Sequence, residues 1–532
     1  MMAFASRETL KSSVANSSLR SGWRAFALCL SFANLCFLNV WAELQDREAD
    51  FFKTSTSTWT QLTAVTLDIL ILAGALWVPI VLAVSSGKRT LVRALKWCIL
   101  AGLMVPINAI RRDPYVIRRS GEILQSRNER LAAGICAVAL AAFLLVRWEK
   151  LSPRVVSVAL TVLLPTFPLV VARTAWIVNS GPSGARPNKP LLPALPQQPG
   201  APHVLWILFD EWDQVLTFEV RPANLQLPEL DRFRGQSFHA DRAYPPARHT
   251  IVSIPSLISG KTFTNSTRHG ASEILETCDL RQPPEPLSAQ STIFREARSA
   301  GFNVGVDGWY LPYSRLFGDF TARGTTKEDY ASLSLTGFMF VAARNQFRAL
   351  PLMSRLGLAV RPDTLEHIRI YLQLRQDAFD MARDRRLNLV FAHLNVPHPP
   401  LIYDAANESF SPRRETTYMD NLALVDRTLG ELRKMMEQAG TWDATTILLG
   451  SDHPLRLDQW QLSNQFHGRT FDLRQRTRVP FLLKMAGETE GVDYPRPIQT
   501  VVTKDLLLAI LAQKVTTAEQ VGVWLDTHPP RQ

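Results

Sequence analysis

The chain has 532 residues, of which 46% are hydrophobic and 20% charged, and its 59 basic and 48 acidic residues give a formal net charge of +11. This length allows two or three domains. The basic residues cluster around apolar segments, where membrane orientation and lipid contact account for them, so the charge does not indicate a nucleic-acid-binding protein.

The first 180 residues contain five segments that approach the roughly 20 apolar residues needed to cross a bilayer. These segments are 23–42, 61–84, 92–110, 130–147 and 155–178. The third contains Arg93 and Lys96, which must lie near the membrane interface. We therefore expect residues 1–180 to form an all-α transmembrane domain of five helices.

Basic residues near the first segment indicate that the amino terminus is cytoplasmic. They are Arg7, Lys11, Arg20 and Arg24. Five spans then place everything after residue 180 outside, which predicts a multi-pass protein of the inner (plasma) membrane with a periplasmic or extracellular domain. Residues 111–130 carry six arginines on the expected outer face. Either the third span is misplaced, or these residues form a basic outer loop that meets anionic lipid headgroups.

Residues 181–202 form a low-complexity segment that contains seven prolines. Such a segment cannot form a helix or a central strand, so it predicts a semi-rigid linker. The next domain should cover residues 203–525, followed by a loose tail over 526–532. Cys278 is the only cysteine after residue 180, so this domain should contain no internal disulfide and depend on its core.

The second half alternates buried-strand and helix patterns, which predicts a large α/β domain with a mostly parallel sheet. The expected strands are 203–209, 303–307, 388–393, 445–450 and 479–484, and the clearest helices are 289–300 and 415–439. Ligands of such sheets gather at the carboxyl ends of the strands. Asp210 and Glu211 follow the first strand directly, and Asp452 and His453 follow the strand 445–450.

The residues Arg248 to Gly260 contain a candidate nucleophile, Thr250, followed by an apolar run with Pro255. A hydroxyl is a poor nucleophile unless a base or a divalent cation activates it. The alternative is that Thr250 only caps a helix, because Thr before an apolar run is common at helix starts.

Histidines follow the strand ends as well. Asp452 and His453 leave one strand together, and their oxygen and nitrogen ligands suit zinc or manganese. His393 and His398 follow another strand, and His467 lies in a polar loop. A single loop histidine is usually a surface residue, but several near strand ends favour a site.

These motifs resemble the alkaline phosphatase and sulfatase superfamily, and within it the membrane-anchored phosphoethanolamine transferases and lipoteichoic acid synthases, which also have five amino-terminal spans. Thr250, Ser253 and Pro255 match the nucleophile motif of the transferases, and Gly260 ends the turn as in sulfatases. The resemblance implies an alkaline-phosphatase-like fold in which Thr250 is both nucleophile and metal ligand, with Ser253 beside the substrate.

The resemblance also implies a divalent metal, zinc first, with manganese, magnesium or calcium as alternatives. Its expected protein ligands are Asp210, Glu211, Thr250, Asp452 and His453.

Further roles follow from the same resemblance. His393 and His398 reproduce the His-x4-His spacing, which implies that one of them protonates the leaving alcohol or activates the acceptor. His467 corresponds to a histidine that binds the substrate phosphate. Trp309 and Tyr310 stand where sulfatases have a substrate-binding motif.

The chain departs from sulfatases at the nucleophile. Their Cys or Ser becomes formylglycine and is followed by Pro two positions and Arg four positions later, whereas this chain has Thr250, Val252 and Ile254. We therefore do not expect sulfate-ester hydrolysis. The disulfides typical of phosphoethanolamine transferases are absent, which leaves the donor headgroup open.

Three functions remain after this comparison. The first is transfer of a phosphoryl-linked headgroup, phosphoethanolamine- or phosphoglycerol-like, from a membrane phospholipid to a lipid- or glycan-linked envelope acceptor through a phospho-threonine. The second is a phosphodiesterase- or phosphatase-type hydrolase with water as the acceptor. The third is an inactive descendant that serves envelope assembly.

Overall fold

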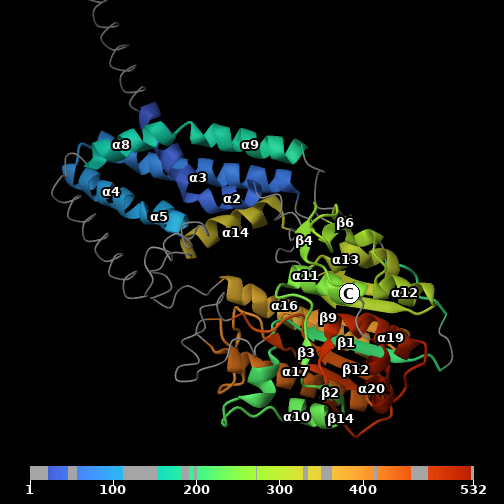
Figure 1. Ribbon diagram of the computed structural model, residues 1–532. Helices are drawn as coiled ribbons and strands as arrows, with labels where there is room; N and C mark the ends of the chain where they lie inside the picture. The colour runs from blue at the N-terminus through green and yellow to red at the C-terminus, as the bar shows by residue number, and fades with distance from the viewer. Residues whose placement is uncertain are drawn as a thin grey trace, which may run out of the picture. The chain divides into compact units, whose positions relative to one another are not determined.

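The computed structural model describes residues 22–45, 57–111, 152–180, 191–196, 200–270, 272–326, 333–348, 362–412, 416–456 and 477–528 (Figure 1). The chain divides into two compact units. The helical unit comprises Met1–Ala49, Thr56–Ala185 and Ser332–Ala359. The sheet unit comprises Asp50–Ser55, Arg186–Ala331 and Val360–Gln532.

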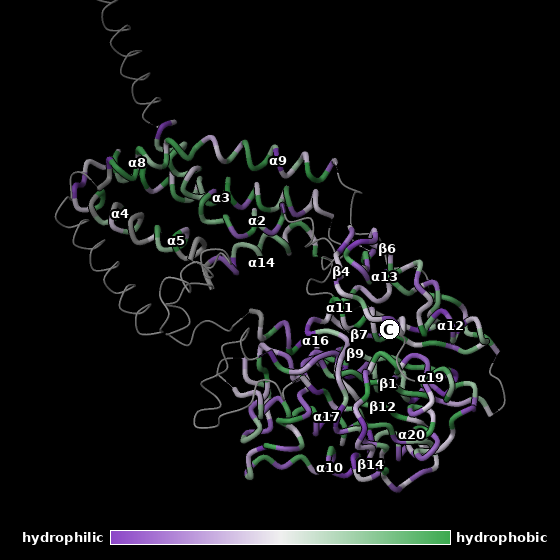
Figure 2. Tube along the Cα trace, in the orientation of Figure 1, coloured by the Kyte–Doolittle hydropathy of each residue, from purple (hydrophilic) through white to green (hydrophobic). Residues whose placement is uncertain are grey.

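The described helices of the helical unit are a helix over Gly22–Cys36, α2 (Leu38–Gln45), α3 (Thr58–Ser85), α4 (Arg89–Gly102), α5 (Met104–Arg111), α8 (Ser152–Leu163), α9 (Thr166–Ser180) and α14 (Leu335–Arg348). Among them, α3 and α8 show the most green in Figure 2. Among the described residues, Thr58–Ser85 and Arg154–Ser180 are long and apolar enough to cross a membrane. Gly22–Cys36 and α2 form a third span if this pair, bent by 60°, is counted as one.

The described residues therefore match up to three of the five expected spans, and the count of five stays a prediction. The expected span 92–110 consists of two shorter helices, α4 and α5, that break at Leu103. The span 130–147 lies outside the described residues, and so does most of the basic segment 111–130.

Helix α14 belongs to the helical unit although it comes from the second half of the sequence. Its Ala342 is buried in the core of that unit, and Phe338 and Ala343 pack against the same core. Residues 338 and 342 are four positions apart and lie on one face of the helix. The sheet unit is thus interrupted in sequence by residues 332–359. The sequence predicts one continuous domain over 203–525 and does not anticipate this interruption.

The sheet unit is built on an eight-stranded sheet with the order β14-β2-β13-β12-β1-β9-β7-β8. Its strands are β1 (His203–Phe209), β2 (Phe238–Ala240), β7 (Val304–Gly308), β8 (Arg323–Thr326), β9 (Leu389–Leu394), β12 (Thr445–Gly450), β13 (Phe481–Lys484) and β14 (Val492–Tyr494). The pairs from β12 to β8 are parallel, and β13 runs antiparallel to both of its neighbours. The predicted mostly parallel α/β fold is confirmed, and the strand expected over 479–484 is the antiparallel exception.

Helices cover both faces of this sheet, so its central strands are apolar on both sides. In β1, Val204 and Trp206 enter one core, whereas Leu205 and Ile207 enter the other. The first core contains residues of α11 (Thr250–Ser259), α12 (Ile293–Ser299), α19 (Thr503–Leu511) and α20 (Ala518–Thr527). The second contains residues of α10 (Pro228–Gly235), α16 (Pro362–Arg383) and α17 (Tyr418–Gln438). Figure 1 shows these two helix groups on either side of the strands.

Short elements complete the sheet unit. They are β3 (Ala243–Tyr244) with β15 (Ile498–Gln499), β4 (Asn265–Arg268) with β5 (Ile274–Thr277) and β6 (Glu285–Pro286), β10 (Tyr403–Asp404) with β11 (Ser409–Phe410), and the helix α13 (Tyr313–Phe317).

Two boundaries differ from the sequence expectation. The described part of the expected linker is fastened to the sheet unit: the Leu192 N–H donates to the Thr321 carbonyl at 2.8 Å, and the Leu195 N–H donates to Asn303 Oδ1 at 2.7 Å. The expected tail starts too early, because Asp526 lies in α20, accepts a hydrogen bond from Tyr494 at 2.6 Å and pairs with Arg496 at 2.7 Å.

Candidate active site

Two neighbouring strands end at one edge of the sheet and bring acidic residues together there. β1 pairs in parallel with β12, with Leu208 opposite Gly450. Asp210 follows the first strand, and Asp452 and His453 follow the second. The carboxyl ends of parallel strands meet at the same edge of a sheet, as the sequence analysis assumed.

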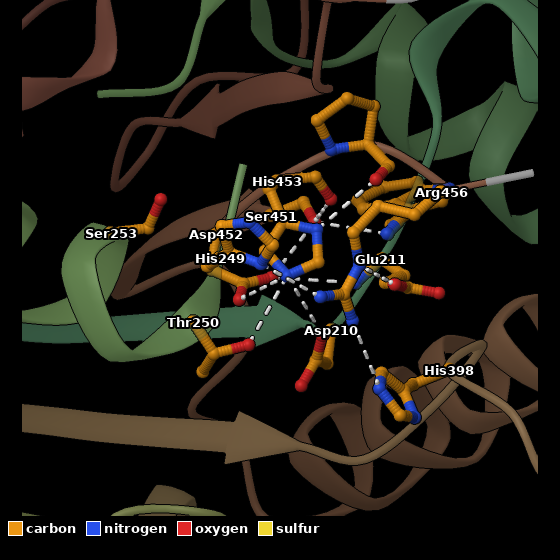
Figure 3. Close-up of polar contacts among 12 residues, drawn as sticks. Asp210, Glu211, His249, Thr250, Ser253, His398, Ser451, Asp452, His453 and Arg456 are labelled. Atoms are coloured by element: carbon orange, nitrogen blue, oxygen red, sulfur yellow. Dashed lines mark hydrogen bonds and ion pairs between the residues drawn. The ribbon is translucent and has the colours of Figure 1, made fainter. Parts of the chain in front are cut away.

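Asp210, Asp452 and His453 form a compact cluster in which one ligand atom from each lies within 4.8 Å of the others. His453 Nε2 is 3.3 Å from Asp452 Oδ2 and 3.8 Å from Asp210 Oδ1. All three side chains are fully buried. Figure 3 shows them converging from the two strand ends.

Thr250 is the first residue of α11, and its hydroxyl points into this cluster (Figure 3). Thr250 Oγ1 is 3.2 Å from His453 Nε2. The N-cap position belongs to His249, whose backbone is extended, so the interpretation of Thr250 as a helix cap is wrong. Gly260 ends the helix in the left-handed conformation, with φ of 68°, as its place at the end of the motif predicted. The positive end of the helix dipole also favours negative charge at Thr250.

The cluster fits a divalent cation. Among the described residues, Asp210 Oδ1 and Asp452 Oδ2 are buried without a hydrogen-bond partner. Burial of unpaired carboxylates is costly, and it is the main reason why the pKa of Asp210 is raised well above its usual value, followed by the charges of Asp452 and Glu211. His453 Nδ1 faces the Pro454 carbonyl at 3.1 Å, which leaves the Nε2 lone pair toward the acids. Two carboxylates and one imidazole are a donor set that suits zinc or manganese.

Glu211 does not join these three ligands. Its φ of 60° lies in the left-handed region, which is uncommon for a residue with a side chain and typical of functional sites. Its N–H donates to Asp452 Oδ1 at 3.3 Å, while its carboxylate pairs with Arg456. The compact cluster among the described residues does not include Glu211, and the role of Glu211 as a second acidic metal ligand stays a prediction.

His393 is buried against the cluster. Its Nε2 is 3.6 Å from Asp210 Oδ2, which is too far for a hydrogen bond, and this nitrogen has no hydrogen-bond partner among the described residues. Its Nδ1 is 2.9 Å from the Tyr313 hydroxyl. Burial lowers the pKa of His393 to about 4, so the ring is neutral at pH 7. Trp309 donates its indole N–H to the same Asp210 oxygen at 3.1 Å, which puts Trp309, an expected substrate-binding residue, beside a predicted metal ligand.

The other expected histidine, His398, lies toward the solvent and is partly exposed. Its Nε2 is 3.5 Å from Arg456 Nη2, and Arg456 Nη1 is 3.1 Å from His249 Nδ1. Arg456 and His249 are not among the site residues that the sequence predicts. Arg456 follows His453 by three residues and His249 directly precedes Thr250, so proximity to a predicted site was their only signal.

The remaining expected residues stay outside the cluster. Ser253 donates its hydroxyl to the Ala247 carbonyl at 2.9 Å, and Figure 3 shows it pointing away, so it stabilises the turn before α11 and does not face a substrate. Tyr310 follows Trp309 with φ of 69° and packs against both cores. His467 lies outside the described residues.

The sheet, the strand-end acids and the buried Thr250 hydroxyl form an α/β scaffold with a cluster that could hold a metal ion. The family model described as sulfatase matches residues 202–513, and the chain belongs to this family. The predicted superfamily is thereby confirmed, and the protein is an enzyme of the alkaline phosphatase superfamily, whose members use divalent metals. No curated protein matches the chain.

Several solved structures are similar to this chain at low identity. The lipoteichoic acid synthase LtaP from Listeria monocytogenes is 11% identical, with 58% of this chain and 72% of that chain covered and a TM-score of 0.35. The phosphonate monoester hydrolase of Agrobacterium radiobacter is 13% identical, with 58% of this chain and 74% of that chain covered and a TM-score of 0.38. A protein in the alkaline phosphatase superfamily from Vibrio parahaemolyticus is 12% identical, with 60% of this chain and 68% of that chain covered and a TM-score of 0.38.

Proposed function

We propose that the protein is a membrane-anchored, metal-dependent transferase that moves a phosphoryl-linked headgroup through a phospho-threonine at position 250. The observation that carries this proposal is the Thr250 hydroxyl, buried 3.2 Å from His453 Nε2 beside Asp210 and Asp452, each of which has a carboxylate oxygen without a hydrogen-bond partner among the described residues. The donor is a membrane phospholipid with a phosphoethanolamine- or phosphoglycerol-like headgroup. The acceptor is a hydroxyl of a lipid- or glycan-linked envelope molecule.

Position 250 favours phosphoryl transfer over sulfate-ester hydrolysis. Formylglycine is an aldehyde made from Cys or Ser, and the methyl group on the Thr250 Cβ rules out that product. The Thr250 side chain instead offers a secondary hydroxyl, which can attack phosphorus once it loses its proton. Its position at the amino end of α11 favours the negative charge that then develops.

The reaction has two displacements. First, Thr250 loses its proton and its Oγ1 forms a bond to phosphorus, while the bond from phosphorus to the diacylglycerol oxygen breaks. The diacylglycerol oxygen takes up one proton, which balances the proton that Thr250 loses. Second, the acceptor oxygen attacks phosphorus, the bond to Thr250 breaks, and Thr250 regains a proton as the acceptor loses one. A divalent cation held by Asp210, Asp452 and His453 would lower the pKa of the hydroxyl and offset charge on the phosphoryl oxygens.

His398 is better placed than His393 to serve the second displacement. His393 is fully buried under Asp210, whereas His398 is partly exposed. His398 Nε2 faces an arginine N–H and therefore carries a lone pair, which can take the proton of the acceptor hydroxyl.

The membrane side follows from the same proposal. The apolar helices hold the enzyme next to a lipid donor, and the sheet unit is on the periplasmic or extracellular side, where envelope acceptors occur. Reporter fusions after residues 86 and 150 should give cytoplasmic signals, and a fusion after residue 200 should give an external one. A cytoplasmic signal after residue 200 would contradict the exported enzyme.

Product analysis tests the reaction itself. Membranes that contain the wild type or Thr250→Ala are incubated with a phospholipid labelled in its headgroup, and mass spectrometry follows the label. We expect labelled envelope acceptor and diacylglycerol with the wild type, and neither with the variant. Labelled free headgroup phosphate without labelled acceptor would show a hydrolase, and no Thr250-dependent product would contradict the proposal.

A further inference from the structure

Arg456 lies beside the cluster, and among the described residues its guanidinium contacts the side chains of Glu211, His249 and His398. Its side chain is largely buried, and its Nε pairs closely with the Glu211 carboxylate. Its two terminal nitrogens face imidazoles: Nη1 lies 3.1 Å from His249 Nδ1, and Nη2 lies 3.5 Å from His398 Nε2. Figure 3 shows these contacts fanning out from one guanidinium.

The contacts fix the protonation of both imidazoles. Arginine only donates hydrogen bonds, so the facing nitrogens of His249 and His398 must accept. His398 agrees with this assignment, because its other nitrogen, Nδ1, lies in close contact with the Pro399 carbonyl and must donate to it. Both rings are therefore neutral around a permanently charged guanidinium.

Neutral imidazoles are weak partners for the two terminal nitrogens. A hydrogen bond between a guanidinium and an anionic oxygen is shorter and about twice as strong as one between neutral groups. The Nη2 contact of 3.5 Å is also longer than the roughly 2.9 Å typical of good hydrogen bonds. An anion at the cluster would replace the histidines on Nη1 and Nη2 while Glu211 kept hold of Nε.

Arg456 is tied to the reacting groups through the residues that contact it. Its partner Glu211 directly follows Asp210 and donates its N–H to Asp452 Oδ1 at 3.3 Å. Its other partner, His249, directly precedes Thr250.

We infer that Arg456 binds the non-bridging oxygens of the substrate phosphate with Nη1 and Nη2, and that Glu211 positions it through Nε. This inference rests on the proposed function, since it assigns the anion that Thr250 attacks. It has one consequence for the reaction: when the phosphate takes Nη2, the Nε2 lone pair of His398 is released for the acceptor hydroxyl. Substrate binding thus makes the base of the second displacement available.

The test measures binding of inorganic phosphate to the full-length, metal-loaded protein in detergent by calorimetry, together with KM and kcat for the phospholipid donor. Arg456→Lys keeps the positive charge but loses the pair of terminal N–H groups that can bind two oxygens at once. We expect phosphate affinity to fall about ten- to a hundredfold and KM to rise by a similar factor. The matched control is Arg433→Lys on α17, because Arg433 pairs with Glu229 at 2.8 Å outside the cluster. Arg433→Lys should leave phosphate affinity unchanged.

A double substitution separates binding from charge balance. If Arg456 only neutralises the buried Glu211, then Glu211→Gln combined with Arg456→Met should restore the phosphate affinity and KM that Arg456→Met alone loses. If Arg456 binds the anion, the double variant should regain thermal stability but not phosphate affinity. Restored affinity, or wild-type affinity in Arg456→Lys, would overturn the inference.

The outcome also separates this inference from the proposed function. Thr250→Ala should still bind phosphate, because it keeps the guanidinium. Arg456-dependent phosphate binding without Thr250-dependent turnover would support the anion site and contradict the transferase. Thr250-dependent turnover together with phosphate binding that does not depend on Arg456 would support the transferase and contradict the anion site.

Discussion

Asp210 and Glu211 are adjacent in sequence, yet they belong to two halves of the site that are neutralised in different ways. In the cation half, Asp210 and Asp452 are buried beside His453, and among the described residues no Lys or Arg forms an ion pair with them. In the arginine half, Glu211 is paired with Arg456. We therefore predict that the cation half takes an ion from solution, whereas the arginine half has its positive charge within the chain. One positive φ, at Glu211, turns the second carboxylate away from the first.

The largest expected effect is on the cation half. Asp452→Asn should lower turnover by more than about a hundredfold, because even the loss of a residue that orients a metal ligand costs 10- to 100-fold. The fold should survive, because the metal-free variant has one fewer unpaired buried charge. The measurement is the melting temperature with and without added zinc: the wild type should be stabilised by the metal and Asp452→Asn should not. A zinc-induced shift of wild-type size in Asp452→Asn would remove Asp452 from the ligand set.

Glu211→Gln probes the arginine half and should act mainly on stability. It leaves Arg456 buried without its carboxylate, which typically costs about 3–5 kcal/mol of unfolding free energy. Metal content should stay at the wild-type value, since the cation half is intact. Chemical denaturation and metal analysis of the same sample check both points. Loss of metal from Glu211→Gln would show that Glu211 is a ligand after all and erase the distinction between the halves.

His367 connects the halves and should give the protein a pH-dependent stability. Its Nε2 faces the carbonyls of Asn395 and His398 at 2.7 and 3.1 Å, and its ring packs against Trp309 at 5.2 Å. Burial lowers the pKa of His367 from 6.5 to about 4. The unfolded state thus binds a proton before the folded state does, and stability falls as pH drops from about 6.5 to about 4, by up to roughly 3 kcal/mol.

Urea unfolding between pH 7 and pH 4 measures this effect of His367. His367→Gln should make the loss of stability in that window smaller, while buried His393, whose pKa is also lowered to about 4, keeps its own share. An unchanged pH profile in the variant would mean that other groups cause the loss.

Tyr313→Phe should have the smallest effect. It removes the hydroxyl that lies 2.9 Å from His393 Nδ1, at a cost of about 1 kcal/mol. Turnover should fall only a few-fold and metal should be retained, because Tyr313 contacts His393, which is not among the three clustered ligands. Steady-state kinetics with metal analysis tests this. A loss of metal would place Tyr313 and His393 closer to the cation than the contacts imply.

The sequence predicts the cation half well because its residues follow strands with unmistakable apolar runs. Asp210 comes after His203–Phe209 and the Asp452–His453 pair after Thr445–Gly450, and parallel pairing brings such ends together. The candidate nucleophile Thr250 is predicted from its motif and from the family resemblance, and the structure places its hydroxyl 3.2 Å from His453 Nε2.

The arginine half was not predictable in the same way. The direction of the Glu211 carboxylate depends on a left-handed backbone that no local residue pattern announces. Arg456 and His249 meet across 207 positions of sequence, so their contact depends on tertiary packing. The same holds for α14, because its short apolar face does not show in the sequence that the helix packs in the helical unit.

The central claim is that Thr250 carries the phosphoryl group, and intact-mass measurement with peptide mapping tests it most directly. The full-length enzyme is exposed to a phospholipid donor without acceptor and quenched with acid. We predict a mass increase equal to the phosphoryl headgroup, located on Thr250, in the wild type and at a lower level in Thr250→Ser, which keeps a hydroxyl. Thr250→Ala should show no adduct while retaining its metal. An adduct on another residue, or wild-type turnover by Thr250→Ala, would contradict the account.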